Sequence, residues 1–447
     1  MVRTYTRQLI ISGAAIGMFC GCSDADGVGD RAEGASDAPP RVARGVPAGF
    51  TSAEWGALRR LSPLPELSRD STNAVAESAE ASELGRQLFC DAGFSGPLRL
   101  ASDLGEVGES GKVACASCHS GPMLDDRRSS PSAVSIGADL HTRNAPGIVN
   151  SSYYVWTNWG GRFSAQWELP LPVVESAIIM NSSRLQVAHR ILDEYREGYE
   201  RIFGALEPSV GTDLARFPAA GKPKAADAPD GAWEQMASGD RDIINEVFVN
   251  YGKALAAYFR VLISPESDFD AFMAGDAVLG ARAENGARLF VGKAGCVTCH
   301  SGPYFSDDDF HNLGLPSPTA DDGRFRDVPP LLASTLGAQG SFSDDPEAGR
   351  ARVQGLTNPM PEAARGAFRT ANLRGVESSG PYMHAGQLET LEEVVEYYDS
   401  GGGETTTGTK DPSLVPLGLS ASEKADLVEF LRSLSGEPIA ASLLCDD

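Results

Sequence analysis

The residues with the most specific chemistry in this sequence are four cysteines and two histidines, arranged in two copies of one short motif. Residues 112–125 read KVACASCHSGPMLD, and residues 293–314 read KAGCVTCHSGPYFSDDDFHNLG. Cys-x-x-Cys-His is the attachment signature of c-type haem, in which both thiols bond to the macrocycle and the His ligates the iron. An isolated Cys-x-x-Cys also occurs in redox dithiols and zinc sites, but the His after both copies favours haem. The sequence therefore predicts two covalent haem c groups, held by Cys115, Cys118 and His119 and by Cys296, Cys299 and His300.

The segments around the two motifs are also duplicated. Apolar residues at helical spacing precede each motif, over residues 74–89 and 277–290, and both segments end in Gly-x-x-Leu-Phe. Such a duplication indicates two similar units. Each unit closes with a predicted helix, at 241–263 and at 420–434, and a further amphipathic helix is expected at 184–204. Because long strand patterns are absent, we expect an all-α fold of two cytochrome c-like domains, each wrapping one covalent haem with long irregular loops.

The N-terminus has the features of an export signal. Arg3 and Arg7 flank the start of the chain, and an apolar run of eleven residues follows, too short to span a bilayer. The run leads into Cys-Gly-Cys, which resembles a lipoprotein cleavage box with Cys22 as the lipidated residue. An ordinary secretory signal, or cleavage at Cys20, is the alternative. We expect a protein of the periplasm or cell envelope, held at the membrane by lipid on Cys22.

Composition and the duplication divide the chain into segments. Residues 23–50 are rich in Gly, Ala, Asp and Pro, as is typical of a disordered linker. The prediction is a lipoprotein-type signal peptide over 1–22, a disordered tether over 23–75, and cytochrome c domains over 76–265 and 266–447. The net charge of −23 argues against nucleic acid and anionic membrane surfaces as partners.

Two cysteines lie outside the haem motifs and the signal region, Cys90 and Cys445. In an oxidising compartment they can pair and tie the C-terminus to the first domain. Two unpaired buried thiols are the alternative, because proximity does not follow from the sequence.

An ordered set of six motifs resembles the bacterial di-haem cytochrome c peroxidase superfamily, and within it the MauG-like branch. The resemblance covers about residues 80–435. Its motifs are CASCHSGP, RNAP (143–146), WGGR (159–162), CVTCHSGPYFSDDDFHNLG, FRTANLRGV (368–376) and PYMHAGQLETLEEVVEYY (381–398).

The resemblance implies different tasks for the two haems. The domain at 76–265 would be peroxidatic and react with hydrogen peroxide, and the domain at 266–447 would transfer electrons. Many members block the first iron with a second His after a Ser-Ile-Gly segment, but here Ala138 follows that segment. His141 is a possible substitute, although a loop His is more often structural. We therefore expect an open iron that needs no reductive activation.

At the second haem, the resemblance implies a ligand fourteen residues after the His of the PYMH segment. That His is His384, and the position is Tyr398, as in MauG-like members. A phenolate is an anionic donor that favours ferric iron. Met383 is the alternative ligand. Between the haems the family places a Trp that relays electrons; the matching residue is Trp159, which packing alone would also explain.

The resemblance also implies a calcium ion near the seam between the domains. The matching residues are Asn144 and, through backbone carbonyls, Ser379 and Pro381. Amide and carbonyl oxygens suit this hard cation.

The expected peroxide pocket departs from the family. A proton-carrying group is needed there, and the family's Gln and Glu positions hold Leu169 and Ile179. Gln166 and Glu175 lie about one helical turn upstream and could supply the same groups. We expect Glu175 to be the acid–base residue, with Gln166 beside it, and Glu168 to face solvent.

These expectations combine into one function. The leading hypothesis is an exported di-haem oxidoreductase that takes electrons from a small redox protein, as cytochrome c peroxidases do, or from a side chain of a protein substrate, as MauG-like enzymes do. The alternative is a non-catalytic di-haem electron-transfer cytochrome with both irons fully ligated.

Overall fold

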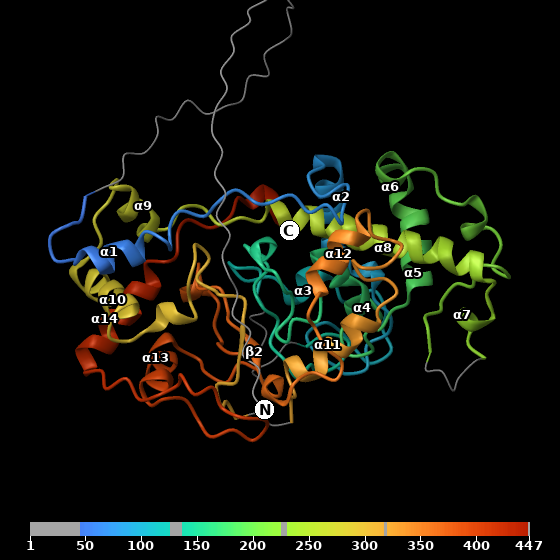
Figure 1. Ribbon diagram of the computed structural model, residues 1–447. Helices are drawn as coiled ribbons and strands as arrows, with labels where there is room; N and C mark the ends of the chain where they lie inside the picture. The colour runs from blue at the N-terminus through green and yellow to red at the C-terminus, as the bar shows by residue number, and fades with distance from the viewer. Residues whose placement is uncertain (1–44, 126–135, 225–229, 317–319, 446–447) are drawn as a thin grey trace, which may run out of the picture. The chain divides into compact units, whose positions relative to one another are not determined.

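The computed structural model describes residues 45–125, 136–224, 230–316 and 320–445 (Figure 1). All of them belong to one compact unit, which runs from Ala43 to Asp447. The predicted signal peptide, Cys22 and residues 23–44 of the predicted tether lie outside the described residues. None of the described helices combines the length and the apolar character needed to cross a bilayer.

The described chain is rich in helices joined by long irregular segments. Its two short strands, β1 (Phe310–His311) and β2 (Phe368–Arg369), pair antiparallel. The α-helices are α1 (Ser52–Leu58), α2 (Ala79–Cys90), α3 (Cys115–Cys118), α4 (Pro170–Glu175), α5 (Arg184–Arg190), α6 (Arg196–Phe203), α7 (Ala232–Gln235), α8 (Ser238–Val261), α9 (Asp268–Ala274), α10 (Ala281–Val291), α11 (Arg324–Ala333), α12 (Pro346–Val353), α13 (Leu391–Asp399) and α14 (Ala421–Arg432).

The predicted helices are confirmed, and the duplication has a structural counterpart. The duplicated segments form α2 and α10, and the closing segments form α8 and α14. In the first half α2 packs on α8, and in the second α10 packs on α14 (Figure 1). A Cβ on Gly85 would collide with the carbonyl oxygen of Ala254, and one on Gly286 with that of Asp426. The repeated glycine therefore marks the crossing point of both helix pairs.

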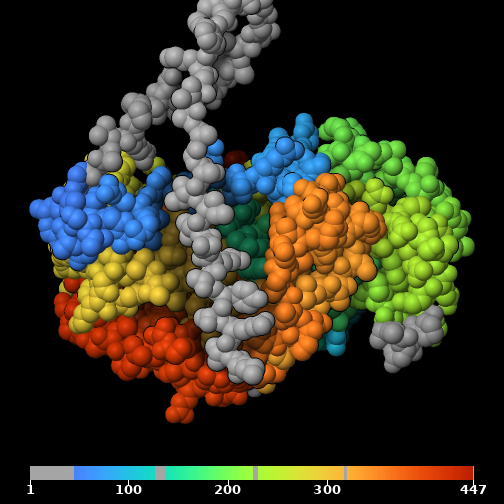
Figure 2. Space-filling view, viewed as in Figure 1, coloured from blue at the N-terminus to red at the C-terminus, as the bar shows by residue number. Residues whose placement is uncertain are grey.

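Two hydrophobic clusters form the interior. The larger consists mainly of residues between 84 and 262, and the smaller of residues 50–61 and 269–434. Residues from 336 to 342 belong to the larger cluster, so a late segment of the chain covers the first half. Figure 2 shows this contact as the orange surface beside the green surface. The boundaries at 75/76 and 265/266 stay predictions, because the compact unit continues through both.

The segment before the first domain differs from the prediction. Residues 51–61 lie within the predicted tether, yet they form α1 and the turn after it. Thr51 and Glu54 close a capping box at its start, and Trp55, Leu58 and Leu61 have no exposed surface. The prediction of a disordered tether is therefore wrong for this segment. An amphipathic turn that buries an indole against the second-half cluster gains more from burial than it loses in entropy.

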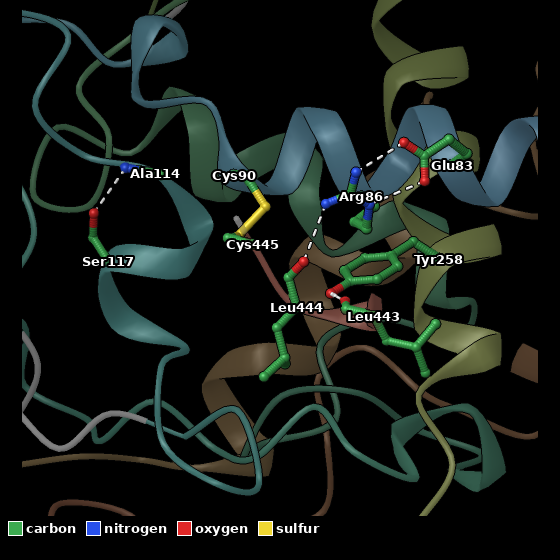
Figure 3. The surroundings of a disulfide bond; sticks show 9 residues. All are labelled: Glu83, Arg86, Cys90, Ala114, Ser117, Tyr258, Leu443, Leu444 and Cys445. Carbon is green, nitrogen blue, oxygen red and sulfur yellow. Dashed lines mark hydrogen bonds and ion pairs between the residues drawn. A yellow bond between two sulfur atoms is a disulfide. The ribbon is translucent and has the colours of Figure 1, made fainter. Parts of the chain in front are cut away.

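A disulfide joins Cys90, at the end of α2, to Cys445 (Figure 3). The pairing resolves the alternatives that the sequence left open. Nearby contacts hold the same C-terminal segment: Arg86 donates to the carbonyl of Leu444 at 3.1 Å, and Tyr258 donates to that of Leu443 at 2.5 Å. The C-terminus is thus fixed to the first half of the chain.

Replacing both cysteines by serine should lower the free energy of unfolding by about 2–4 kcal/mol, because the bond closes a loop of 355 residues in the unfolded chain. Urea unfolding of the haem-loaded protein measures the change. Reduced wild-type protein is the control and should match the variant. Equal midpoints for the oxidised wild type and the double variant would contradict a stabilising role.

Candidate functional site

The two motif histidines have the same local geometry. Nδ1 of His119 lies 2.8 Å from the carbonyl oxygen of Leu124, and Nδ1 of His300 lies 2.9 Å from that of Phe305. Leu124 and Phe305 both have positive φ angles, which turn their carbonyls back toward the ring. A carbonyl only accepts, so Nδ1 carries the proton and Nε2 is the nitrogen suited to a metal. Burial lowers the pKa of His300, which favours the neutral imidazole that ligation requires.

The four motif cysteines form no disulfide, in contrast to Cys90 and Cys445. Burial raises the pKa of Cys115 and of Cys296 to about 12. Redox-active dithiols need a thiolate and therefore a lowered pKa. The surroundings of these thiols fit covalent attachment of a macrocycle better than thiol–disulfide exchange.

The second motif opens into a cavity of about 490 Å³. This volume lies in the range of cofactor sites, and its walls hold thiols, an imidazole and a phenol. The lining includes Cys296, Cys299, His300, Trp159, Met383 and Tyr398. These residues fit a haem c, with Tyr398 and Met383 both present as the expected alternative ligands.

Tyr397 and Tyr398 are adjacent on α13 but have different surroundings. The hydroxyl of Tyr397 donates to the carbonyl of Leu313 at 2.9 Å and accepts from the amide of Gly403 at 2.7 Å. Tyr398 instead lines the cavity of the second motif. Burial raises the pKa of the Tyr398 phenol, so a nearby metal ion would be needed to stabilise its phenolate.

Ala138 lies where the family often has a blocking His. It is fully buried, its amide donates to the carbonyl of Ile179 at 2.7 Å, and its carbonyl accepts from Arg99 at 2.7 Å. Its methyl side chain offers no ligand. Nδ1 of His141 lies 2.8 Å from the carbonyl oxygen and 3.0 Å from the amide nitrogen of Arg143, so its ring is engaged within its own loop.

The carboxylates near the expected peroxide pocket differ from the prediction. Glu175 ends α4, as expected, but Arg184 binds both of its oxygens, at 2.8 and 2.9 Å. An acid–base role would require this pair to open. Glu168, expected in solvent, is only 4% exposed and accepts hydrogen bonds from Ser164 and the amide of Ala338. The assignment of Glu168 to solvent is wrong because the segment around Ala338 covers it.

Gln166 and Trp159 are bound to backbone carbonyls. Gln166 donates through its amide to the carbonyl of Ser151. The indole of Trp159 donates to the carbonyl of Asn144 at 2.8 Å, and its side chain lines the cavity. The indole is therefore fixed beside the second site, although these contacts leave its relay role untested.

Two of the predicted calcium ligands lie together. The side-chain amide nitrogen of Asn144 donates to the carbonyl of Pro381 at 3.0 Å. Ser379 lines the same cavity, and its hydroxyl, which is not the predicted ligand atom, donates to the carbonyl of Val376. Asn144 Oδ1 is buried without a hydrogen-bond partner among the described residues. An amide oxygen without a donor beside a carbonyl oxygen suits a hard cation, so these residues fit calcium.

A buried ionic group that the sequence did not indicate lies beside this site. Arg143 binds Asp321 at 2.7 and 2.8 Å and Asp327 at 2.6 Å, and all three side chains are buried. Arg143 is the first residue of the RNAP motif. The motif drew attention to this arginine but gave no sign of the two aspartates that bind it. His384 lies nearby and stacks on Phe368, with ring centroids 3.7 Å apart.

Comparisons with known proteins agree with this geometry. Residues 79–278 match the family model described as di-haem cytochrome c peroxidase. The chain is 32% identical over 411 residues to the cytochrome-c peroxidase IdrP1 of Denitromonas iodatirespirans, covering 88% of this chain and 92% of that protein. It is 31% identical over 370 residues to the methylamine utilization protein MauG of Methylorubrum extorquens, covering 80% and 79%.

Solved structures share the fold. A MauG-like protein associated with microbial copper homeostasis matches with a TM-score of 0.58 at 24% identity, over 90% of this chain and 99% of that one. The diheme peroxidase BthA from Burkholderia thailandensis matches with a TM-score of 0.57 at 20% identity, over 84% and 91%.

The motifs, the cavity and the helix-rich fold define a di-haem oxidoreductase. The chain belongs to the di-haem cytochrome c peroxidase family, which includes MauG. It is a di-haem peroxidase with two haem cofactors, and its chemistry is electron transfer.

Replacing Tyr398 by Phe should alter the low-spin haem signal in electron paramagnetic resonance, because the substitution removes only the phenol oxygen that is predicted to bind the second iron. Tyr397→Phe is the matched control; its oxygen binds backbone, so its low-spin signal should stay that of the wild type. An unchanged signal in Tyr398→Phe, with a changed one in Met383→Leu, would assign the ligand to Met383.

Glu168 should make stability depend on pH. Burial raises its pKa to about 7 from the ordinary value of 4.5. The folded state therefore favours the protonated acid; this contribution is complete below about pH 4.5 and is lost as the pH rises through 7. Glu168→Gln should match the wild type at pH 4.5 but be more stable at pH 8, by about 3 kcal/mol at most.

Urea unfolding of both proteins across this pH range measures the difference. Glu197→Gln is the control, because the Glu197 side chain is 93% exposed. A stability difference between Glu168→Gln and the wild type that does not change with pH would contradict the raised pKa.

Proposed function

We propose that this protein is an exported peroxidase that reduces hydrogen peroxide at the haem bound by His119 and oxidises a protein donor through the haem bound by His300. The observation that carries the proposal is the asymmetry of the two sites. Position 138 presents a buried methyl group, whereas Tyr398 lines the cavity of the second motif. A haem held by His119 would then be open to peroxide, and one held by His300 would have Tyr398 as its second protein ligand.

Each half would be a cytochrome c-like domain that wraps its haem, with the peroxidatic domain at 76–265 and the electron-transfer domain at 266–447. When bound, haem supplies an iron that cleaves peroxide and stores the oxidising equivalents. The protein holds each imidazole through a backbone carbonyl and buries the thiols and Tyr398 at least in part. Trp159 would relay electrons, because its indole is fixed in the cavity wall.

Proton transfer at the peroxide would come from a carboxylate. Glu175 remains our proposal for this role, with Gln166 beside it, on condition that the pair with Arg184 opens. Glu168 is the second candidate, since an acid with a pKa near 7 can both take up and release a proton at neutral pH. A Glu175 that stays bound to Arg184 could not transfer this proton, which favours the alternative of a pure electron-transfer cytochrome.

The donor would be a small redox protein or a side chain of a protein substrate. Relatives of this chain are named as cytochrome-c peroxidases and as MauG, which represent these two classes. A lipid on Cys22 would hold the protein at the membrane of the periplasm or cell envelope, and calcium at Asn144, Ser379 and Pro381 would fix the seam beside the cavity.

The ferric protein as isolated should show one high-spin and one low-spin haem, and its absorption spectrum should change on adding hydrogen peroxide before any reduction. The reason is the methyl group at position 138, which leaves the first iron without a sixth protein ligand. Electron paramagnetic resonance and stopped-flow absorption measure both properties.

Ala138→His is the matched variant, because it restores the side chain that blocks the iron in other members. It should convert the high-spin signal to low-spin and make the peroxide reaction depend on prior reduction. Two low-spin haems in the wild type, with no response to peroxide, would support the electron-transfer alternative.

A further inference from the structure

Three tyrosine side chains connect the cavity of the second motif with the surface, and a tryptophan lines the same cavity. Trp159 and Tyr154 both line the cavity. The ring centroid of Tyr154 is 6.5 Å from that of Tyr304, and Tyr304 stacks on Tyr153 at 6.1 Å. Tyr153 is only partly buried, and its hydroxyl bonds the carbonyl of Pro65 among exposed residues. Rings at these separations can pass an electron stepwise.

Tyr304 is also close to the second motif along the chain. It lies within the loop from His300 to Phe305, whose carbonyl orients the His300 ring at 2.9 Å. The same short loop therefore fixes the proximal imidazole and places Tyr304 between Tyr153 and Tyr154.

The hydroxyl of Tyr304 has a distinctive partner. It donates to Oδ2 of Asp308 at 2.7 Å, and Asp308 is buried, with a positive φ angle that a non-glycine residue rarely adopts. Burial raises the pKa of the Asp308 carboxyl, which makes its carboxylate a better proton acceptor. A phenol that loses an electron becomes a strong acid, so oxidation of Tyr304 would be coupled to proton transfer over this bond.

The other three aromatic residues lack such an acceptor. The indole of Trp159 and the hydroxyl of Tyr153 both donate to backbone carbonyls, which do not take up protons. The guanidinium of Arg369 lies 3.6 Å from the ring centroid of Tyr154, and a cation there opposes the removal of an electron. Of the four, Tyr304 is therefore the residue on which an electron vacancy is most stable.

We propose that Tyr304 is a redox-active tyrosine that connects the second haem with the protein donor; the proposal rests on the peroxidase function above. One electron passes from Tyr304 to the haem centre oxidised by peroxide, the O–H bond breaks, and the proton moves to Asp308 Oδ2. The products are a neutral tyrosyl radical and a neutral carboxylic acid. An electron from the donor, arriving at Tyr153, then restores Tyr304, and the proton returns from Asp308.

The test is electron paramagnetic resonance of the haem-loaded protein, freeze-quenched after one equivalent of hydrogen peroxide without a donor. We expect a tyrosyl radical signal that changes with ring-deuterated tyrosine and is lost in Tyr304→Phe. Asp308→Asn keeps a hydrogen-bond acceptor but cannot take the proton, so the signal should be lost there also. Spin trapping and peptide mass spectrometry should place the adduct on Tyr304.

Tyr195→Phe is the matched control. Tyr195 also donates to a carboxylate, that of Asp91 at 3.0 Å, but Arg190 binds this carboxylate directly at 2.9 Å, whereas Arg369 comes no closer to Asp308 than 3.7 Å. The Tyr195→Phe protein should therefore give the same radical signal as the wild type.

The outcomes separate this proposal from the peroxidase function. If peroxide changes the haem spectra but gives no tyrosyl radical, or if the radical persists in Tyr304→Phe, the proposal is wrong and the peroxidase function stands. If peroxide leaves both haem spectra unchanged, the peroxidase function fails, and the Tyr304 proposal fails with it. Unchanged resting haem spectra in both variants show that they are folded and loaded.

Discussion

Buried arginine side chains hold the irregular loops of this protein in place. In the described part of the chain only two short strands provide a ladder of backbone hydrogen bonds, so buried loop carbonyls need other donors. A guanidinium group offers five N–H donors in a fixed plane. Arg324 donates to the carbonyls of Gly160 and Gly161, and Arg374 donates to that of Pro303. Both arginines are buried, so the loops can be fixed without regular secondary structure.

Arg143 makes contacts of the same kind between segments that lie far apart in the chain. Its pairs with Asp321 and Asp327 are nearly excluded from water, and removal of one partner from such a pair typically costs about 3–5 kcal/mol. The next residue, Asn144, donates from its backbone amide to the carbonyl of His384. Its backbone carbonyl accepts from the indole of Trp159. Asn144, which lines the cavity, is therefore held next to this ionic group.

Features that depend on local spacing could be predicted from the sequence. The haem motifs and the duplicated helices follow from residues close together in the chain. Tyr398, which lines the cavity, was singled out by the family resemblance. The surroundings of Glu168 and Glu175 could not, because Arg184 and the segment near Ala338 reach them through tertiary packing. The helix within residues 51–61 could have been predicted from a Thr-x-x-Glu capping box before an apolar turn. The composition of the neighbouring segment instead favoured a disordered linker.

The arginines that hold the loops also influence where an electron vacancy can reside. Arg369 lies over Tyr154, and Arg324 lies 4.4 Å from the ring of Trp156. Removing an electron from either ring would place two positive charges close together in a medium of low dielectric constant, where they are poorly screened. Arg369 also lies 3.7 Å from Asp308, but Tyr304 donates to that carboxylate, which offsets the cation and can take the proton. The arginines that stabilise the irregular loops therefore also make Tyr304 a better site for an electron vacancy than Tyr154 or Trp156.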